Sequence, residues 1–257
     1  SLACIPTSSQ GGAQLLIKEN GILAGVNIAA QIFNEFDSSF KFEKLINDGV
    51  RVSIGDVGFK VHGNSRTLLS AERLVLNVMQ RMSAIATLTN KYVKELKGLK
   101  TKVLDTRKTT PLIRFLEKEA VRIGGGMNHR YGLYDMIMLK DNHNDFAGGI
   151  ENSINKTVKY LKANNLNLKI EIETRNLSEV EEVLKVGKVN RIMLDNFNYD
   201  NMRKAVELID GKYETEASGG INLNTVRNYA ECGVDYVSVG ALTHSVSNMD
   251  LSLKAIF

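Results

Sequence analysis

The sequence of 257 residues lacks several features that mark special classes of protein. It has two cysteines, Cys4 and Cys232, which exclude a disulfide framework and a four-cysteine zinc site and fit a reducing compartment. It has two prolines, and no Ser/Gly-rich linker or low-complexity tract divides it into halves. No apolar run reaches the ~18 residues that a membrane span needs. The nearest run, residues 21–33, is interrupted by Asn27 and Gln31.

A large excess of one charge is also missing. The chain has 33 Lys and Arg against 29 Asp and Glu, a net charge of +4, which is too small to predict binding to nucleic acid. No signal-peptide pattern opens the sequence. We therefore expect a cytoplasmic enzyme or binding protein with neither nucleic acid nor membrane as its partner.

One segment departs from this balance. Between residues 97 and 130 there are nine Lys and Arg but only three acidic residues. The pairs Arg107–Lys108 and His129–Arg130 lie beside Thr- or Gly-rich turns and do not follow the spacing of an exposed helix face. This pattern favours a small anionic ligand.

The order of predicted elements indicates a mixed α/β fold. Short alternating runs and one helix over about 26–34 predict an α/β unit in the first 66 residues, and apolar spacing predicts a long helix over 68–96. From residue 100 on, strands alternate with helices at intervals of 25–35 residues, which favours parallel strands. The pattern alone leaves both an α/β barrel and an open doubly wound sheet open. The predicted strands are 102–104, 136–139, 168–172, 191–194, 213–217 and 236–239.

Polar residues follow each of these six strands. The carboxyl ends of parallel strands share one edge, where the active sites of α/β barrels lie, so the pattern favours an enzyme site over a solvated edge. The segments in question are Asp105–Thr109, Lys140–His143, Glu173, Asp195–Asn196, Ser218–Gly220 and Gly240–Ala241.

Several of these segments suit phosphate or metal binding. Ser218–Gly219–Gly220 and Gly240–Ala241 can offer backbone N–H groups to a phosphate, although each is also an ordinary tight turn. Glu173 and Asp195 can ligate Mg²⁺ or hold ribose hydroxyls. Glu171 lies two residues before Glu173 and is expected on the same face of its strand.

Lys140 follows an apolar run, so we expect a partly buried ammonium group with an anionic partner. The histidines do not have the spacing of a zinc site, and no Gly-x-Gly-x-x-Gly or Walker loop is present.

Taken together and in order, these motifs resemble quinolinate phosphoribosyltransferase, the carboxylating nicotinate-nucleotide pyrophosphorylase. The resemblance extends from about residue 15 to the end of the chain. Its segments are Glu72–Arg73, Leu76–Asn77, Asp105–Thr109, Gly124–Arg130, Lys140–His143, Glu171–Glu173, Leu194–Phe197, Glu216–Gly220 and Gly240–Ser245.

The resemblance implies an α/β fold with an N-terminal α/β sandwich domain over residues 1–66 and an incomplete (open) α/β barrel over 67–245. A C-terminal helix over 246–257 is expected to pack on the sandwich. The resemblance further implies a homodimer with shared active sites, in which Arg73 comes from the partner. The implied reaction joins quinolinate and phosphoribosyl pyrophosphate, with Mg²⁺, to give nicotinate mononucleotide, pyrophosphate and CO₂ in de novo NAD biosynthesis.

The resemblance also implies roles for individual residues. Lys140, Glu173 and Asp195 would be catalytic, and Glu173 and Asp195 would also hold the magnesium ion, directly or through water. The full set of substrate-binding residues would be Arg73, Thr106, Arg107, Lys108, His129, Arg130, Lys140, Glu173, Asp195, Ser218, Gly219, Gly220, Val239, Gly240 and Ala241.

Three alternatives remain at this point. A paralogue with the same fold would act on another pyridine acid or serve molybdenum metabolism. An aldolase would use Lys140 to form a Schiff base with a carbonyl substrate. A non-catalytic protein would bind an anion without turnover.

Overall fold

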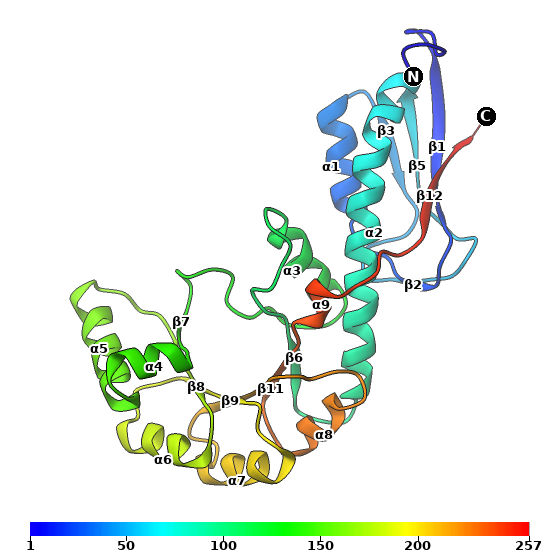
Figure 1. Ribbon diagram of the computed structural model, residues 1–257. Coiled ribbons are helices and arrows are strands. Elements are labelled where there is room, and N and C mark those ends of the chain that lie inside the picture. The colour runs from blue at the N-terminus through cyan, green and yellow to red at the C-terminus, as the bar shows by residue number, and fades with distance from the viewer. Residues whose placement is uncertain (257) are drawn as a thin grey trace. The chain divides into compact units, whose positions relative to one another are not determined.

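The computed structural model describes residues 1–256, which form two compact units (Figure 1). Unit 1 contains residues 1–91 and 109–126 and the chain from 242 on, and unit 2 contains residues 92–108 and 127–241. Each unit is built on its own main sheet. Because the residue ranges of the two units alternate along the sequence, the polypeptide passes between them more than once.

Unit 1 contains an antiparallel sheet with the strand order β12-β1-β5-β3. Strand β1 is central, and its inward residues Ala13, Leu15 and Ile17 are buried. These residues alternate with more exposed ones, as expected for a sheet with one buried face. The strands of unit 1, including the small pair β2 and β4, are β1 (Gln10–Ile17), β2 (Gly21–Ile22), β3 (Lys41–Lys44), β4 (Arg51–Val52), β5 (Val57–Asn64) and β12 (Leu251–Ile256).

The core of unit 1 is apolar and rich in phenylalanine. Helix α1 (Val26–Phe36) contributes Phe33, whose ring lies 5.4 Å from that of Phe40 and 6.1 Å from that of Phe59, measured between centroids. Helix α2 (Ser65–Glu95) adds Val75 and Met79, which are fully buried one turn apart. Helix α3 (Arg114–Ile123) and most of the short helix α9 (Ala241–His244) also belong to this unit.

The predicted C-terminal helix over 246–257 is wrong, although the segment does pack on the N-terminal sheet. Residues Leu251–Ile256 form strand β12, which pairs antiparallel with β1, and residue 257 lies outside the described residues. The physical reason is that Leu251 and Leu253 alternate with Ser252 and Lys254. That period of two suits a strand added to the edge of a sheet.

The division between the units also differs from the boundary expected at residue 66. Unit 1 continues through most of α2 to Lys91. The reason is that buried α2 residues such as Leu68, Ala71 and Val75 belong to the same apolar core as the N-terminal strands.

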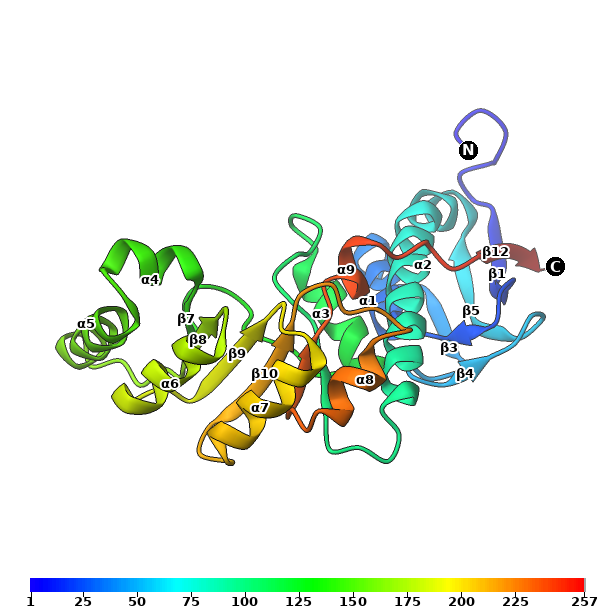
Figure 2. The same cartoon turned by 60° about the horizontal axis from the view of Figure 1, so that its bottom comes forward.

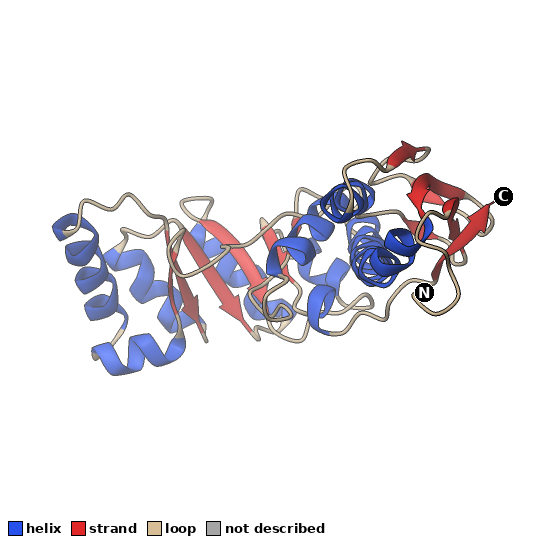
Figure 3. Ribbon diagram, turned by 90° about the horizontal axis from the view of Figure 1, so that it is seen from above, coloured by secondary structure: helices blue, strands red, loops and turns tan. Residues whose placement is uncertain are grey.

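Unit 2 contains a parallel sheet of six strands in the order β6-β11-β10-β9-β8-β7. Strands β7, β8, β9 and β10 follow one another in Figure 2, and Figure 3 shows the strands in red and the helices in blue. Strands β6 and β7 are its two edges, and within residues 1–256 they do not pair with each other. The sheet is therefore an incomplete barrel, and the predicted fold class is confirmed. The strands are β6 (Lys102–Leu104), β7 (Ile137–Leu139), β8 (Ile170–Thr174), β9 (Arg191–Asp195), β10 (Glu214–Ser218) and β11 (Tyr236–Ser238).

Helices α6, α7 and α8 lie along the outer side of this curved sheet (Figure 1). Alternate strand residues such as Ile172, Ile192 and Val237 are fully buried. The helices of unit 2 are α4 (Asp141–Ala147), α5 (Ile150–Ala163), α6 (Leu177–Val186), α7 (Tyr199–Ile209) and α8 (Val226–Glu231). Among the described residues, no helix combines the length and apolar character required to cross a membrane.

Candidate active site

The carboxyl edge of the unit 2 sheet gathers most of the residues predicted for the site. Lys140 follows β7 directly, and Glu173 is the last residue but one of β8. Asp195 and Ser218 are the last residues of β9 and β10. Because the strands are parallel, these positions share one edge. The other predicted residues of unit 2 lie in the segments after β6, β10 and β11, namely Thr106, Arg107, Lys108, His129, Arg130, Gly219, Gly220, Val239, Gly240 and Ala241. Arg73 is exposed on α2 and belongs to unit 1.

Two arginines in unit 2 are close enough to influence each other. Burial lowers the pKa of the Arg130 guanidinium, and the positive charge of Arg107 lowers it further. The Nε atom of Arg107 is buried, and it has no hydrogen-bond partner among residues 1–256. Neighbouring guanidinium groups with donors to spare are an arrangement that an anion with two carboxylates would stabilise.

The backbone that carries Arg130 is held by a buried carboxylate. Asp105, fully buried after β6, accepts the backbone N–H of His129 at 2.8 Å and the side-chain amide of Asn128 at 2.6 Å. The Arg130 guanidinium donates to the carbonyl of Met136 at 3.4 Å and lies 3.6 Å from the sulfur of Met138. The Asn128–His129–Arg130 turn is therefore anchored from two sides.

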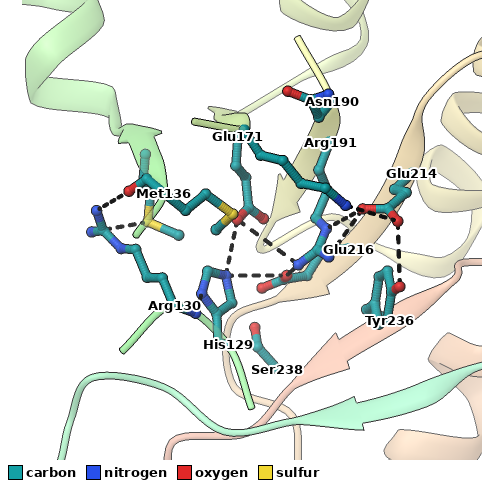
Figure 4. A network of polar contacts seen from close by, with 12 residues as sticks. His129, Arg130, Met136, Glu171, Asn190, Arg191, Glu214, Glu216, Tyr236 and Ser238 are labelled. Atoms are coloured by element: carbon teal, nitrogen blue, oxygen red, sulfur yellow. Dashed lines mark hydrogen bonds and ion pairs between the residues drawn. The ribbon is translucent and has the colours of Figure 1, made fainter. Parts of the chain in front are cut away.

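Behind this turn lies a cluster of buried charged side chains on the inner side of the sheet (Figure 4). Nε2 of His129 lies 2.9 Å from Glu171 Oε2 and 3.4 Å from Glu216 Oε2. Arg191 Nη1 lies 3.0 Å from Glu216, and the guanidinium also stacks 4.1 Å above the centre of the Tyr236 ring. We call His129, Glu171, Glu216 and Arg191 the buried charged cluster. Glu171, Arg191 and Glu216 are positioned by the alternation along β8, β9 and β10, where every second residue points inward. His129 comes from the segment between α3 and β7.

The members of the cluster shift one another's pKa values. Burial lowers the pKa of His129, but the two carboxylates more than offset this and raise it to about 9. Burial and the charge of Glu216 raise the pKa of Glu171 to about 7. Since Nδ1 of His129 accepts the backbone N–H of Arg130 at 2.6 Å, Nε2 is the ring nitrogen that carries the hydrogen, and it points toward the two carboxylates. The guanidinium of Arg191 supplies positive charge to the two buried acids.

A second acidic group lies at the edge itself. Nζ of Lys140 lies 3.4 Å from Glu173 Oε2, which supplies the anionic partner expected for this lysine, although its side chain is 51% exposed. Burial raises the pKa of Glu173, the Lys140 charge opposes this, and the charge of nearby Asp195 raises it again. The carboxylates of Glu173 and Asp195 are near enough for one to raise the pKa of the other, and such a pair favours a bound cation.

The loop after β10 approaches Asp195 closely. The backbone N–H of Asn196 donates to the carbonyl of Ser218 at 2.9 Å, and the Asn196 amide donates to Asp195 Oδ2 at 2.6 Å. Gly219 has a left-handed φ of +98°, and a Cβ there would lie 2.2 Å from Asn196 Oδ1. A side chain at this position would displace Asn196, so the close approach of the loop to the Asp195–Asn196 segment requires glycine.

The trio His129, Glu171 and Glu216 also has the residue types of a metal site, with ligand atoms within 4.8 Å of one another. Its charges argue against that role. Arg191 already neutralises Glu216, and Nε2 of His129 lies at hydrogen-bonding distance from Glu171. The acids at the edge, Glu173 and Asp195, are the better candidates for a cation.

Sequence reasoning did not assign roles to four residues that shape the site. These residues are Asp105, Asn128, Arg191 and Asn196. Part of the signal was present, because Arg191, Met193 and Asp195 share the period of two that links Glu171 to Glu173. Asp105 and Asn128 are 23 residues apart, and no local pattern pairs them.

Comparisons with known proteins place the chain in a family. The N-terminal domain of quinolinate phosphoribosyl transferase matches residues 1–83, and its C-terminal domain matches residues 85–254. A quinolinate phosphoribosyltransferase [decarboxylating] of Nicotiana tabacum is 46% identical over 98% of this chain and 75% of its own length. A probable nicotinate-nucleotide pyrophosphorylase [carboxylating] of Bacillus subtilis is 42% identical over 94% of this chain and 82% of its own.

A solved structure points the same way. The crystal structure of NadC from Streptococcus pyogenes superposes with a TM-score of 0.93 at 38% identity, over 99% of this chain and 90% of that one. The resemblance seen in the motifs is thereby confirmed, and the chain belongs to the quinolinate phosphoribosyltransferase family.

Proposed function

We propose that this protein transfers a phosphoribosyl group to quinolinate and decarboxylates the product, giving nicotinate mononucleotide, pyrophosphate and CO₂. It is then a nicotinate-nucleotide pyrophosphorylase (carboxylating) and serves de novo NAD biosynthesis. The names of its relatives support this activity. The structural observation that carries it is the pair Arg107 and Arg130, since a buried Nε without a partner beside a second guanidinium suits a dicarboxylate.

Quinolinate binding would use the cations of the strand edge. Arg107 and Arg130 would each hold a carboxylate, with Lys108 and Lys140 adding charge and Thr106 shaping the turn through its bond to the N–H of Lys108. A ligand with one carboxylate would leave part of this positive charge uncompensated. This set of cations would therefore favour quinolinate over nicotinate.

Phosphoribosyl pyrophosphate would bind at the carboxyl ends of β8, β9, β10 and β11. The backbone of Ser218, Gly219 and Gly220, with that of residues 239–241, would take the 5′-phosphate. Glu173 and Asp195 would hold the ribose hydroxyls and a magnesium ion, since two neighbouring carboxylates are hard oxygen donors that suit Mg²⁺. When bound, the ion would supply positive charge for the departing pyrophosphate.

The protein's own groups would then stabilise the charges that develop. As pyrophosphate leaves, the ribose C1 becomes oxocarbenium-like, and the carboxylates of Glu173 and Asp195 would stabilise it while the ring nitrogen attacks. Decarboxylation needs no organic cofactor, because the positive ring nitrogen of the ribosylated pyridinium stabilises the electron pair left at C2 when CO₂ departs. A proton that comes ultimately from solvent then takes the place of the carboxylate at C2. The site has to exclude water from the departing carboxylate while holding the other one.

Arg73 enters the proposal through a homodimer in which each active site uses the partner subunit's arginine. Mixing Arg73→Ala chains with Lys140→Ala chains tests this, because half of randomly paired dimers are hybrids and each hybrid has one intact site of two. Activity should recover to about a quarter of wild type. Inactivity of both variants and of the mixture would place the two residues in one subunit's site.

The proposed reaction is tested by an assay for pyrophosphate release with quinolinate, nicotinate and nicotinamide in parallel. Rapid release with quinolinate, Mg²⁺ and phosphoribosyl pyrophosphate is expected, with CO₂ formed in equal amount. Similar specificity constants for quinolinate and nicotinate would refute the assignment.

A further inference from the structure

The proposed reaction leaves one buried set of ionisable groups without a role. Glu171 and Glu216 are fully buried, and the side chain of Arg191 is only 11% exposed. Burying three charges costs free energy unless each has partners. Apolar side chains could fill this part of the sheet at lower cost, so the charges call for an explanation in terms of what they hold.

What they hold is the ring of His129. Its side chain is 5% exposed, and both ring nitrogens face protein groups (Figure 4). Nε2 points to Glu171 and Glu216, and Nδ1 accepts the backbone N–H of Arg130. The charged groups around the ring are Glu171 from β8, Arg191 from β9 and Glu216 from β10, with Asp105 on its backbone N–H and Arg130 following it in the chain.

The His129 ring in turn fixes the backbone N–H of Arg130. The bond from the Arg130 N–H to Nδ1 and the bond from the His129 N–H to Asp105 hold two successive peptide groups. The guanidinium then donates to the Met136 carbonyl, and it lies near enough to Arg107 for that positive charge to lower its pKa. A ring that turned away from the two carboxylates would release the N–H of Arg130 and let its side chain shift.

We propose that Glu171 and Glu216, balanced by Arg191, are positioning residues for dicarboxylate recognition: they hold the His129 ring and, through it, Arg130 in the place where it acts together with Arg107. This inference rests on the proposed function, because it takes quinolinate as the ligand of the two arginines. It also changes the role expected for His129. The histidine supports the arginine instead of contacting the substrate itself.

The first test is Glu216→Gln, which keeps the size of the side chain and removes its charge. The KM for quinolinate should rise about tenfold, whereas kcat and the KM for phosphoribosyl pyrophosphate should stay within about twofold of wild type. A general loss of structure would change all three parameters or the amount of folded enzyme. Glu171→Gln should reproduce the result, and it serves in place of Glu216→Gln if that variant does not fold.

The matched control is Glu214→Gln. Glu214 lies on the same strand two residues earlier and pairs with the same Arg191 at 3.0 Å, but it makes no contact with His129 among those described. Its removal should leave the KM for quinolinate within about twofold of wild type. An equal rise in both variants would mean that any change at Arg191 perturbs the site, and the inference would be wrong.

A double-mutant cycle tests the route through Arg130. If the acids act through this arginine, adding Glu216→Gln to Arg130→Ala should raise the KM for quinolinate no further. Adding His129→Asn to Arg130→Ala distinguishes support from direct contact. The KM for quinolinate should rise no further if His129 only supports Arg130, and it would rise further if His129 contacts the substrate itself. Losses that multiply in either pair would overturn the proposed route.

The outcomes separate the two proposals. Absence of turnover with quinolinate in the wild-type enzyme would refute the proposed function. Turnover in the wild type, a raised KM in Arg130→Ala and an unchanged KM in Glu216→Gln and Glu171→Gln would refute only the positioning role.

Discussion

The two units of this protein differ in the side chains that they bury against one face of their main sheet. The core of unit 1 between its sheet and helices α1 and α2 is apolar, with Phe33 and Phe59 fully buried at its centre. The inner side of the unit 2 sheet instead contains buried Glu171 and Glu216 with Arg191. Both units are α/β, so the difference does not follow from fold class.

The difference separates stability from function. Burial of apolar area is favourable whatever the exact neighbours, so the unit 1 core stabilises the fold without fixing any single group. Buried charges are tolerated only in a balanced, oriented set, and such sets cluster at functional sites. The interior of unit 2 therefore gives up some stability to hold particular side chains in place.

The largest effect is expected in the unit 1 core. Phe33→Ala should lower the free energy of unfolding by about 3–5 kcal/mol, because it removes a fully buried ring that contacts three other phenylalanines. Urea denaturation measures this change. Phe36→Ala, on the same helix but 44% exposed, should cost less than about 1 kcal/mol. Similar losses in the two variants would contradict the comparison.

A loss of activity without loss of stability is expected at the edge of unit 2. Asp195→Asn keeps the size of the side chain and removes the charge assigned to ribose and Mg²⁺, so turnover should fall on the order of 100-fold, or about 2.7 kcal/mol. Quinolinate affinity should hardly change, as measured by titration. Asp200→Asn, with a side chain 86% exposed on α7, is the control. Weaker quinolinate binding with unaltered Mg²⁺ dependence would show that Asp195 has another role.

The loop after β10 should respond to a single methyl group. Gly219→Ala would put a Cβ 2.2 Å from Asn196 Oδ1 at a φ of +98°, so the loop and Asn196 must move. The KM for phosphoribosyl pyrophosphate should rise about tenfold, or about 1.4 kcal/mol. Gly211→Ala has a similar φ of +67° but open space around the Cβ, and it should leave this KM unchanged. Equal KM values in the two variants would exclude close packing as the cause.

The smallest effect is expected at the amino ends of the unit 2 strands, opposite the candidate site. Lys100 pairs with Asp235 at 2.8 Å, and both side chains are partly exposed, so Lys100→Met should cost less than about 1 kcal/mol. Burial raises the pKa of Asp235, but bonds from Lys100 and Thr215 bring it below the usual 3.8. The stabilisation is therefore present above pH 3.8 and is lost as pH falls through the lower, folded-state pKa. Thermal unfolding of both proteins against pH measures it, and a difference that grows at low pH would contradict this sign.

Much of unit 2 could be predicted because its signals are local. Runs such as Arg191–Leu194 are strongly apolar and of strand length, and a polar residue follows each one. The parallel arrangement then brings Lys140, Glu173, Asp195 and Ser218 to one edge by topology alone. The ends of the chain gave weaker signals, and the segment taken for a C-terminal helix is β12, because whether a short apolar segment forms a strand depends on a free sheet edge.

The sequence by itself determined the alternation of strands and helices, the acids and glycines at the strand ends and the motifs of the family, since each depends on neighbours along the chain. Only the tertiary structure decided that His129 faces Glu171 and Glu216, because these residues come together from segments more than 40 positions apart. It also decided the direction of their pKa shifts, which depend on burial and on distances across the sheet. Charge interactions through a low-dielectric interior are fixed by position in space, and no pattern along a chain encodes them.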